Sequence, residues 1–439
     1  MNSIYQGKTV AVLGLGRSGR AAADFLLRRG AQVRVYERVP IPPDAWGAFA
    51  ARGAVLCTGE MPSVLPEEIL VRSPVIRPDL PPIARSVAAG SELTSEVELF
   101  LRHTPARVFG VTGSDGKTTT STLLALILQG GGHTVHLGGN IGTPLLSQID
   151  GMRQGDLAVL ELSSFQLMTL SRGVERAVVT NLTPNHLDWH TDMAEYAAAK
   201  RRICTAGTRH LILNGEDGTL RRWRTDVPVT YFSLSARGIV WEREGERREC
   251  PVPDGFRLVG RHNRLNLAAA MAAAEGLAVP REEVLRAFGG VPHRLQHVDT
   301  VRGVRYFDSS IDTSPSRTAA TLAAMEGEGA VILLAGGRAK GVPFEPMIAA
   351  ACARVRALCL YGEAGESIAR AAAGRLTVHR FESFEQAFRA AAALARAGDA
   401  VLLSPACTAF DQFRDFEARG ETFCRLVQAW KREQEAADG

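Results

Sequence analysis

The sequence predicts an α/β protein with three regions, each built on a mainly parallel sheet. Each region repeats an apolar strand, a glycine-containing turn and a helix, the order that is typical of parallel α/β folds. The chain has 439 residues, of which 46% are hydrophobic and 22% are charged, so it is long enough for two or three domains with separate cores. We place the boundaries near residues 95 and 297, which gives domains 1–95, 96–297 and 298–439.

The first region begins with a glycine turn between a strand and a helix. We expect a strand at residues 10–13, a helix that includes the apolar residues 25–27, and a second strand that ends at Glu37. Residues 14–19 read G-x-G-x-x-G, and an acidic residue after the next strand makes this pattern typical of NAD sites. The physical requirement is that the backbone approaches a diphosphate at a helix N-terminus. Any nucleotide diphosphate would fit, so NAD binding and a turn that serves packing alone both stay open.

The second region contains a lysine and three threonines at a strand-turn-helix junction, VTGSDGKTTT at residues 111–120. This stretch resembles a P-loop with altered spacing, because Val111 stands where the first glycine is expected. The backbone amides of residues 113–118 can cradle phosphates, Lys117 can reach the outer phosphates, and the Thr118 hydroxyl can bind Mg²⁺. The alternative interpretation is a glycine-rich turn with an exposed lysine.

Two apolar strands further along this region end in polar residues, where open α/β sheets place their sites. Glu161 follows the strand LAVL, and a carboxylate there is costly unless it meets a cation such as Mg²⁺ held by Thr118; a surface glutamate is the alternative. The next strand leads to His186, Asp188 and His190. Zinc is an alternative for these three residues, although no cysteine or third well-spaced histidine lies nearby and a phosphate loop favours Mg²⁺.

Composition and charge argue against several classes of protein. The formal net charge of +4 is small, and lysine and arginine form no stripe of the kind that binds nucleic acid. Seven scattered cysteines without C-x-x-C indicate neither disulfides nor a zinc knuckle. The N-terminus lacks the features of a signal peptide, and no apolar run reaches the ~18 residues of a membrane span. We expect a cytoplasmic monomer that binds neither nucleic acid nor membrane.

Together, these residues resemble the Mur ligase family, ATP-dependent enzymes that join amino acids to UDP-N-acetylmuramoyl precursors of peptidoglycan. The loop TGSDGKT at 112–118 is similar to the family's loop, with Asp115 where asparagine is commoner. Four further motifs carry the resemblance: GGNIGTP at 138–144, ELSSFQL at 161–167, HRLQ at 293–296 and LLSPACTAFDQFRDFEARGETF at 402–423. They are most similar to the members that add D-glutamate to UDP-N-acetylmuramoyl-L-alanine.

The resemblance implies an N-terminal Rossmann-like domain that binds the UDP-substrate, a central P-loop ATPase domain with a mainly parallel sheet, and a C-terminal Rossmann-like domain with the amino-acid site. It implies ATP and two Mg²⁺ ions as cofactors, and UDP-N-acetylmuramoyl-L-alanine and D-glutamate as substrates. ATP would phosphorylate a carboxylate of the UDP-substrate, and the glutamate amine would then attack the acyl phosphate. Amide formation from a carboxylate needs such activation.

The resemblance also assigns individual residues. ATP would contact Gly113, Ser114, Asp115, Gly116, Lys117, Thr118, Thr119, Asn263, Asn266, Arg294 and Asp308. Catalysis would rest on Lys117, Glu161, His186 and Lys200, and the metal ions on Thr118, Glu161, His186 and Lys200, the last as a carbamate. The UDP-substrate would contact Gly16, Arg17, Ser18, Ser73, Asn140 and Ser163, and the amino acid Thr313, Lys340, Thr408 and Phe416. Without the resemblance, we would interpret Lys200 as a solvated helix lysine.

Four positions depart from the family's motifs. Ser310 stands where many relatives have lysine, and Ala409 where a serine often meets the amino acid. Val39 replaces an arginine that some relatives place on the uridine phosphates, and Val75 breaks the usual S-P-G. All four lie in the first and third domains, so they bear on substrate contacts rather than on the ATPase core.

Three other functions stay as alternatives. An NAD-dependent oxidoreductase would use residues 14–19 and Glu37, and a P-loop switch or motor protein would hydrolyse ATP to move a partner. A Mur-type ligase for a different amino acid is the third.

Overall fold

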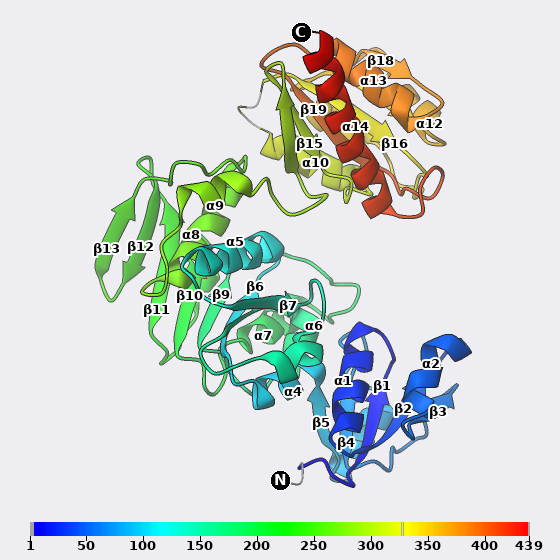
Figure 1. The fold of residues 1–439 in the computed structure, drawn as a ribbon, viewed down its shortest axis with the longest axis vertical. Helices are drawn as coiled ribbons and strands as arrows, with labels where there is room; N and C mark the ends of the chain where they lie inside the picture. The colour runs from blue at the N-terminus through cyan, green and yellow to red at the C-terminus, as the bar shows by residue number, and fades with distance from the viewer. Residues whose placement is uncertain (1–3, 326, 328, 438–439) are drawn as a thin grey trace. The chain divides into compact units, whose positions relative to one another are not determined.

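The computed structural model describes residues 4–325, 327 and 329–437. These residues form three sheets that follow one another along the chain (Figure 1). Most neighbouring strands in each sheet are parallel, and helices connect many of them. The predicted α/β class is therefore confirmed.

The first sheet has five parallel strands in the order β3-β2-β1-β4-β5. Its strand, helix and second strand lie where the sequence predicts them, and β2 ends at Glu37. The strands are β1 (Thr9–Leu13), β2 (Gln32–Glu37), β3 (Val55–Thr58), β4 (Ile69–Arg72) and β5 (Glu92–Ser95), and the helices are α1 (Arg17–Arg28), α2 (Pro43–Ala50) and α3 (Pro81–Ala88).

Helices cover both faces of this sheet. Val12 of β1 packs in one buried cluster with Phe25 of α1, whereas its neighbour Leu13 packs in another with Ile83 of α3. Successive side chains of a strand point to opposite faces. Because both faces are buried, the central strand β1 is apolar from Val10 to Leu13.

The second sheet has eight strands in the order β13-β12-β11-β10-β9-β6-β8-β7. The strands β6 to β11 pair with one another in parallel, and β12 and β13 add an antiparallel edge beyond β11. The strands are β6 (Arg107–Thr112), β7 (Val135–Gly139), β8 (Leu157–Glu161), β9 (Arg176–Val179), β10 (His210–Asn214), β11 (Val229–Leu234), β12 (Ile239–Arg243) and β13 (Glu246–Cys250). The order β9-β6-β8 brings the carboxyl ends of three strands to one place.

The helical elements between residues 96 and 287 are α4 (Glu96–His103), α5 (Lys117–Gly130), the 3-10 helix η1 (Leu145–Gly151), α6 (Ser164–Leu167), α7 (Met193–Arg201), the 3-10 helix η2 (Leu220–Arg222), α8 (Arg261–Ala274) and α9 (Glu282–Ala287). α5 contacts β6, β7 and β8. The alanine-rich helix α8 begins at Arg261, and the polar sequence RHNR forms its first turn.

The third sheet has six strands in the order β14-β15-β19-β16-β17-β18, all parallel except β14 against β15. Its strands are β14 (Gln296–Val301), β15 (Val304–Asp308), β16 (Val331–Gly336), β17 (Val355–Tyr361), β18 (Val378–Arg380) and β19 (Ala400–Ala406), and its helices are α10 (Pro315–Ala324), α11 (Glu345–Ala351), α12 (Gly365–Ala372), α13 (Phe384–Leu394) and α14 (Phe416–Ala437).

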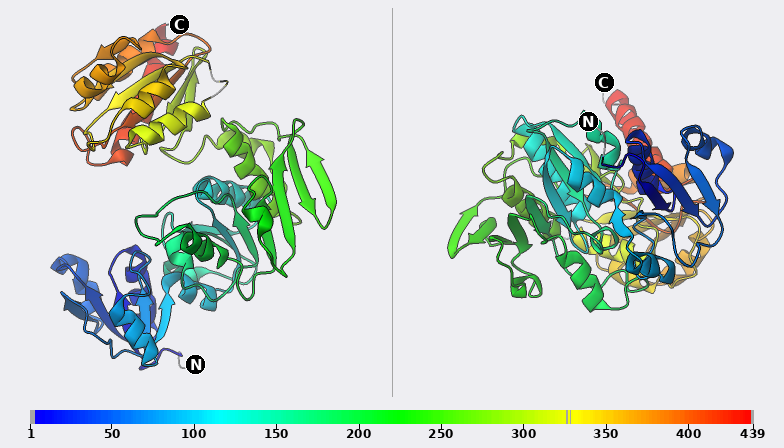
Figure 2. Two further views of the ribbon diagram at one scale, coloured as in Figure 1. Left: turned by 180° about the vertical axis from the view of Figure 1, so that it is seen from behind. Right: turned by 90° about the horizontal axis from the view of Figure 1, so that it is seen from below.

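This sheet is also covered on both faces. Leu333 of β16 packs with Met347 of α11, and the next residue, Leu334, packs with Phe423 of α14. Figure 2 shows α10 and α11 in yellow on the face opposite α14. The apolar strands that the sequence predicts here are therefore buried by helices on two sides.

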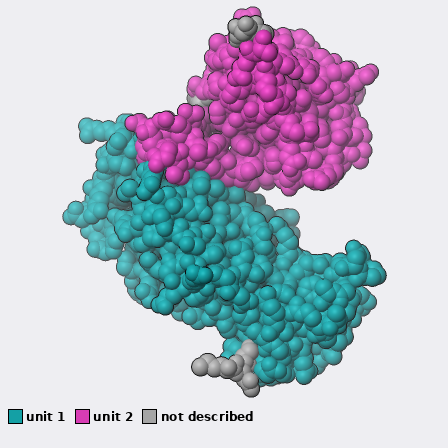
Figure 3. All heavy atoms as spheres, in the orientation of Figure 1, with its two compact units in different colours: residues 1–252, 265–281 teal, residues 253–264, 282–439 magenta. Residues whose placement is uncertain are grey.

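The three sheets form two compact units, residues 1–252 with 265–281 and residues 253–264 with 282–439 (Figure 3). The first two sheets belong to one unit because Phe25 of α1, Phe100 of α4 and Leu146 of η1 share a single buried cluster. The boundary near residue 95 falls between β5 and α4, and that near 297 falls within β14. Both boundaries stay predictions.

Candidate active site

The loop between β6 and α5 has the backbone of a phosphate-binding turn. Gly113 and Gly116 have φ angles of +149° and +79°. A Cβ atom at Gly113 would lie 1.8 Å from the Thr180 hydroxyl oxygen, and one at Gly116 would lie 2.3 Å from Oδ1 of Asn266. Glycine is therefore required at both positions, which accounts for the tight G-S-D-G-K-T spacing.

Residues after β9 hold this loop in place. The backbone N–H groups of Ser114 and Asp115 donate to the backbone carbonyl and to Oδ1 of Asn181 at 3.0 and 2.9 Å. The Ser114 hydroxyl donates to the Thr183 carbonyl at 2.8 Å and accepts from the Tyr196 hydroxyl at 2.9 Å. Ser114 and Asp115 thus fix the loop, and their contacts with ATP stay a prediction.

Lys117 and Thr118 form the start of α5, where backbone N–H groups have no partner within the helix. The Lys117 ammonium donates to the carbonyls of Gly113 and Ser114 at 3.0 and 2.9 Å, so this side chain lies over the loop. Thr118 is half-buried and Thr119 is buried. A helix N-terminus and an ammonium beside a glycine turn together favour a bound phosphate.

Glu161 lies at the end of β8, directly beside β6 in the sheet. It is 1% exposed, and its Oε1 accepts a hydrogen bond from Asn140 Nδ2 at 2.8 Å. Its Oε2 is buried without a hydrogen-bond partner. An unpartnered buried carboxylate oxygen is costly, and Mg²⁺ prefers such oxygens as ligands. The residues therefore fit a bound Mg²⁺, and the interpretation of Glu161 as a surface residue is wrong.

His186 follows β9 in a turn with a left-handed backbone, at φ +55°, and its side chain is exposed over part of its surface. Its carbonyl accepts hydrogen bonds from the backbone N–H groups of Trp189 and His190 at 3.1 and 2.9 Å. Partial burial, and then the charges of Lys117 and Lys200, lower the pKa of His186 below its ordinary value. The neutral imidazole that this favours is the form that binds metal ions.

His190 does not complete a zinc site with His186 and Asp188. It is 2% exposed, and its two ring nitrogens hydrogen-bond with Glu195 Oε2 at 3.2 Å and Ser164 Oγ at 2.9 Å. In the described part of the chain, no three His, Cys, Asp or Glu side chains are grouped to hold a metal ion. The zinc alternative therefore lacks its third ligand.

Lys200 is buried, so its interpretation as a solvated lysine is wrong. Its side chain extends from α7 to the loop, where Nζ donates to the Gly113 carbonyl at 2.7 Å and lies 4.7 Å from the centre of the Tyr196 ring. Burial, and then the charge of Lys117, lower the pKa of Lys200 to about 6. The structure thus places Lys200, Lys117 and the glycine loop together.

Asn266 also lies against the loop. Its Oδ1 is 3.3 Å from Oγ1 of Thr120, one turn into α5. Asn263, one turn earlier on α8, donates from Nδ2 to the Val259 carbonyl at 2.7 Å. The contact of Asn263 and Asn266 with adenine stays a prediction.

Asp308 and Arg294 belong to the second compact unit. Asp308 is fully buried at the end of β15, and its carboxylate accepts from His293 Nδ1 at 2.7 Å and from the backbone N–H of Ser310 at 2.8 Å. The hydrogen bond to Asp308 raises the pKa of His293. Arg294 is exposed, and the roles of Arg294 and Asp308 toward ATP stay predictions.

The glycine turn of the first sheet is fixed by its own acidic residue. Gly16 precedes α1, which begins with the exposed Arg17 and the half-buried Ser18. The Glu37 carboxylate accepts from the backbone N–H of Leu15 at 2.8 Å and from that of Arg38 at 3.0 Å. The carboxylate that an NAD site would place on a ribose is thus engaged by the loop's backbone.

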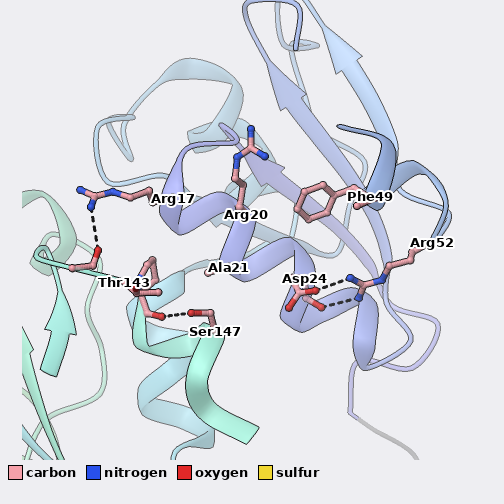
Figure 4. Close-up of a pocket in the computed structure, with 11 residues that line it drawn as sticks. Arg17, Arg20, Ala21, Asp24, Phe49, Arg52, Thr143 and Ser147 are labelled. Atoms are coloured by element: carbon pink, nitrogen blue, oxygen red, sulfur yellow. Dashed lines mark hydrogen bonds and ion pairs between the residues drawn. The ribbon is translucent and has the colours of Figure 1, made fainter. Parts of the chain in front are cut away.

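Several predicted UDP-substrate residues lie close to this turn. Ser73 follows β4, and its backbone N–H donates to the carbonyl of Leu13 at the end of β1. Arg17 donates to the Gly142 carbonyl at 3.1 Å, in the segment that contains Asn140 (Figure 4). Ser163 caps α6 instead, with its hydroxyl accepting from the backbone of Gln166.

A hollow of about 430 Å³ lies beside the Arg17 contact, between α1, α2 and the segment after β7 (Figure 4). Of the predicted UDP-substrate residues in the described chain, Arg17 alone lines it. This hollow is therefore distinct from the glycine turn at which we expect the nucleotide.

The predicted amino-acid residues lie at the carboxyl ends of β15, β16 and β19, which are adjacent in the third sheet. Lys340 Nζ donates to Oγ1 of Thr313 at 3.0 Å. Thr408 and Arg338 exchange two backbone hydrogen bonds of 3.0 Å, and the Thr408 hydroxyl donates to the Arg338 carbonyl. Phe416 begins α14. The structure brings together the loops that carry Thr313, Lys340 and Thr408. The contact of these residues and Phe416 with an amino acid stays a prediction.

The departures from the family's motifs have different structural settings. Val39 and Val75 are 65% and 68% exposed, whereas Ala409 is buried. Ser310 accepts a hydrogen bond at Oγ from the buried Arg419 at 2.9 Å. The Ser310 side chain is thus part of the packing beneath the strand ends.

Two buried arginines that support these loops were not predicted from the sequence. Arg72 is 1% exposed and donates to the carbonyls of Pro74 and Phe165 at 2.9 and 2.6 Å. Its position directly after the apolar strand ILV is a signal that could have identified it. Arg419 lies four residues before Phe423, on the buried face of α14, and that spacing is the corresponding signal.

The parallel sheets, the glycine loop with its lysine, and the buried carboxylate beside it define a nucleotide-binding α/β protein. The Mur ligase middle domain matches residues 111–274, and the Mur ligase glutamate ligase domain matches residues 293–407. The UDP-N-acetylmuramoylalanine–D-glutamate ligase of Clostridium perfringens is 37% identical over 96% of this chain and 97% of the relative. The ligase of the same name from Ruminiclostridium cellulolyticum is 36% identical over 97% of each chain. The chain belongs to the Mur ligase family, whose members are ATP-dependent ligases.

Solved structures share this fold at low sequence identity. A MurF ligase from Thermotoga maritima in complex with ADP aligns with a TM-score of 0.54 and 17% identity, over 99% of this chain and 96% of the other. The UDP-N-acetylmuramate–alanine ligase of the same organism aligns with a TM-score of 0.53 and 18% identity, over 97% and 100%. Of the helices in the described residues, none has the length and apolar character that crossing a membrane requires.

Proposed function

We propose that this protein adds D-glutamate to UDP-N-acetylmuramoyl-L-alanine, with ATP as the energy source, in the synthesis of peptidoglycan precursors. The observation that carries the proposal is the similarity over 96% of the chain to relatives named for this reaction. The glycine loop, Lys117 and the unpartnered oxygen of Glu161 support the ATP-dependent half of the reaction.

The reaction would proceed through an acyl phosphate. The γ-phosphoryl group of ATP passes to the substrate carboxylate, the glutamate amine attacks the acyl carbon, and phosphate leaves the tetrahedral intermediate. Lys117 and the N-terminus of α5 would stabilise the charge of the transferring phosphoryl group. Gly113 and Gly116 would allow the backbone to approach the phosphates.

We propose that the remaining predicted residues hold two Mg²⁺ ions. Thr118 and Glu161 would hold one ion, and His186 with carbamylated Lys200 would hold the second. Bound Mg²⁺ would neutralise charge on the phosphoryl group during its transfer. The unpartnered Oε2 of Glu161 is the feature of this chain that supports such binding.

The three predicted domains would divide the binding tasks. Residues 1–95 would hold the UDP-substrate through Gly16, Arg17, Ser18 and Ser73, with Asn140 and Ser163 contributed by residues 96–297. Residues 298–439 would bind D-glutamate through Thr313, Lys340, Thr408 and Phe416. We further propose a cytoplasmic monomer.

The glycine turn of residues 14–19 should bind UDP rather than a nicotinamide cofactor. Its carboxylate, Glu37, is engaged by the backbone N–H groups of Leu15 and Arg38, so it has less capacity for a ribose. Titration of the protein with UDP and with NADH, followed by calorimetry, should give saturable binding for UDP alone. Micromolar NADH binding that NAD displaces and UDP does not would contradict this assignment.

The deciding test of the function is a substrate panel. With UDP-N-acetylmuramoyl-L-alanine, ATP and Mg²⁺, phosphate release should require D-glutamate, because Lys340 and the nearby hydroxyl groups can bind its carboxylates. Product mass identifies the amino acid that is added. Preference for L-alanine, L-lysine or diaminopimelate would keep the ligase chemistry and overturn the named substrate. Phosphate release that needs neither UDP-sugar nor amino acid would instead favour a motor or switch.

A further inference from the structure

Residues 72–77 of the first sheet's domain, which we call the clamp segment, are bound to the second sheet's site by hydrogen bonds. Arg72 lies at the start of this segment and donates to the Phe165 carbonyl in α6. In the opposite direction, the indole N–H of Trp189 donates to the Val75 carbonyl at 3.0 Å. The clamp segment, which contains Ser73, is therefore attached both to α6 and to the turn that contains His186.

Arg77 makes three further attachments to the second sheet's site. Its guanidinium donates to both oxygens of Glu195, at 2.7 and 3.1 Å, and to the Trp189 carbonyl at 2.8 Å. The Arg77 and Glu195 side chains are each 22% exposed. Bidentate pairs of this kind fix geometry as well as charge, so the pair is more than a solvated surface contact.

Glu195 connects Arg77 to the residues around His186 through further hydrogen bonds. Its Oε2 also accepts from the Thr191 backbone N–H at 2.8 Å and pairs with His190 Nδ1. The other ring nitrogen of His190 meets the Ser164 hydroxyl at 2.9 Å. The Glu195 carboxylate thus connects the clamp segment to the 186–192 turn directly and to α6 through His190.

The backbone of His186 depends on this arrangement. Its φ of +55° is unfavourable for a residue with a side chain. The His186 carbonyl is held by the N–H groups of Trp189 and His190, the two residues that Arg77 and Glu195 bind directly. Loss of the Arg77 contacts would release the residues that keep His186 in this conformation.

We propose that Arg77 is a positioning residue that holds His186 in its metal-binding orientation through Glu195, Trp189 and His190. The inference rests on the proposed function, because it takes His186 as a ligand of Mg²⁺. Arg77 also donates to both carboxylate oxygens of Asp79, at 2.9 and 2.7 Å, and this pair holds its guanidinium in place. Its other contacts are to Glu195 and Trp189, so Arg77 acts through these residues rather than on the substrates.

The kinetic test compares Arg77→Ala with the wild type under varied Mg²⁺. Loss of an outer-shell support typically costs 10–100-fold in metal affinity, so we expect the half-saturating Mg²⁺ concentration to rise by at least about tenfold. The KM for D-glutamate should stay unchanged. Arg77→Lys keeps the charge without the forked geometry and should restore part of the Mg²⁺ affinity. An unchanged Mg²⁺ dependence in Arg77→Ala would overturn the proposal.

The matched control is Arg107→Ala. Arg107 forms a similar two-contact pair with Glu175 at the start of β6, so its loss should lower stability without changing the Mg²⁺ dependence. If Arg77→Ala does not fold, Glu195→Gln tests the same link, since it weakens the pair while keeping the size of the side chain. A normal Mg²⁺ dependence in Glu195→Gln would then contradict the proposal.

Hydrogen exchange gives a readout that does not require activity. Backbone amides of residues 186–192 should exchange faster in Arg77→Ala than in the wild type, while those of β6 should keep their protection. Equal exchange at 186–192 would overturn the positioning role. A wild-type protein without ligase activity would instead refute the proposed function, and the exchange result would still report on the link itself.

Discussion

Lys117→Ala should abolish phosphoryl transfer, with ADP production reduced by roughly 10³-fold or more, the scale expected when a preorganised cation is removed from this transition state. The Lys117 ammonium lies over the loop, bonded to the carbonyls of Gly113 and Ser114, from which it can turn to the outer phosphates. An alanine there leaves the N-terminus of α5 as a partial charge in place of a full one. ADP production is measured with UDP-N-acetylmuramoyl-L-alanine, D-glutamate, ATP and Mg²⁺.

The fold of Lys117→Ala should persist, because Asn181, Thr183 and Tyr196 hold the loop through other atoms. Thermal unfolding of the variant should therefore stay close to that of the wild type. Lys431→Ala is the matched control: Lys431 pairs with Asp299 on the third sheet, and its loss should leave ADP production unchanged. Normal ADP production in Lys117→Ala would remove the loop from the mechanism.

The sheets could be predicted because their strands are buried on both faces. Neighbouring residues such as Val12 and Leu13, or Leu333 and Leu334, pack against different helices, and this produces continuous apolar runs that are visible in the sequence. Polar residues after such runs then identify the carboxyl ends of the strands, as Glu161 does. The start of α8 is harder to predict than these strands, because the first turn of the helix is polar and no apolar periodicity identifies it.

The glycine loop could be predicted because its constraint is local. Gly113 and Gly116 have φ angles of +149° and +79°, which residues with a side chain rarely adopt, so the turn requires glycine at both positions whatever else surrounds them. The contacts that hold the loop are different in kind. Asn181 and Tyr196 lie 66 and 82 residues from their partners, and no local pattern reports such pairs.

The contact between Arg77 of the clamp segment and Glu195 could not be predicted from a local sequence pattern either. Arg77 and Glu195 are 118 residues apart, and each is an ordinary charged residue in its own stretch of sequence. The fold pairs them because β4 ends beside the turn after β9 in one compact unit. Charge alone could not select this partner among 47 acidic residues.

The sequence contains a signal for the burial of Lys200, although this residue by itself is interpreted as solvated. Tyr196 and Ala199 are buried on the same face of α7, and Lys200 lies four residues after Tyr196, so it shares that face. The run of alanines hides the pattern, because alanine occupies buried and exposed helix positions equally well. The spacing from Tyr196 would have predicted the burial of Lys200.

Lys200→Ala should lose nearly all activity, because we propose that Lys200 holds a metal ion as a carbamate. An ammonium beside Mg²⁺ is repelled, whereas a carbamate supplies two anionic oxygens of the kind that Mg²⁺ prefers. Burial lowers the pKa of Lys200 to about 6, which favours the neutral amine. That amine adds CO₂ to form the N–C bond of the carbamate and releases one proton.

Three measurements separate a carbamate from a lysine that serves packing alone. With ¹³C-bicarbonate, the wild type should show a carbamate signal in its NMR spectrum that is absent in Lys200→Ala. Acetate, a small carboxylate that can enter the space left by the side chain, should restore part of the activity of Lys200→Ala. Lys200→Met keeps the volume of the side chain, so it should fold and still be inactive. Full activity in Lys200→Met would leave Lys200 with a packing role, because a methionine fills the same space and cannot carry a carbamate.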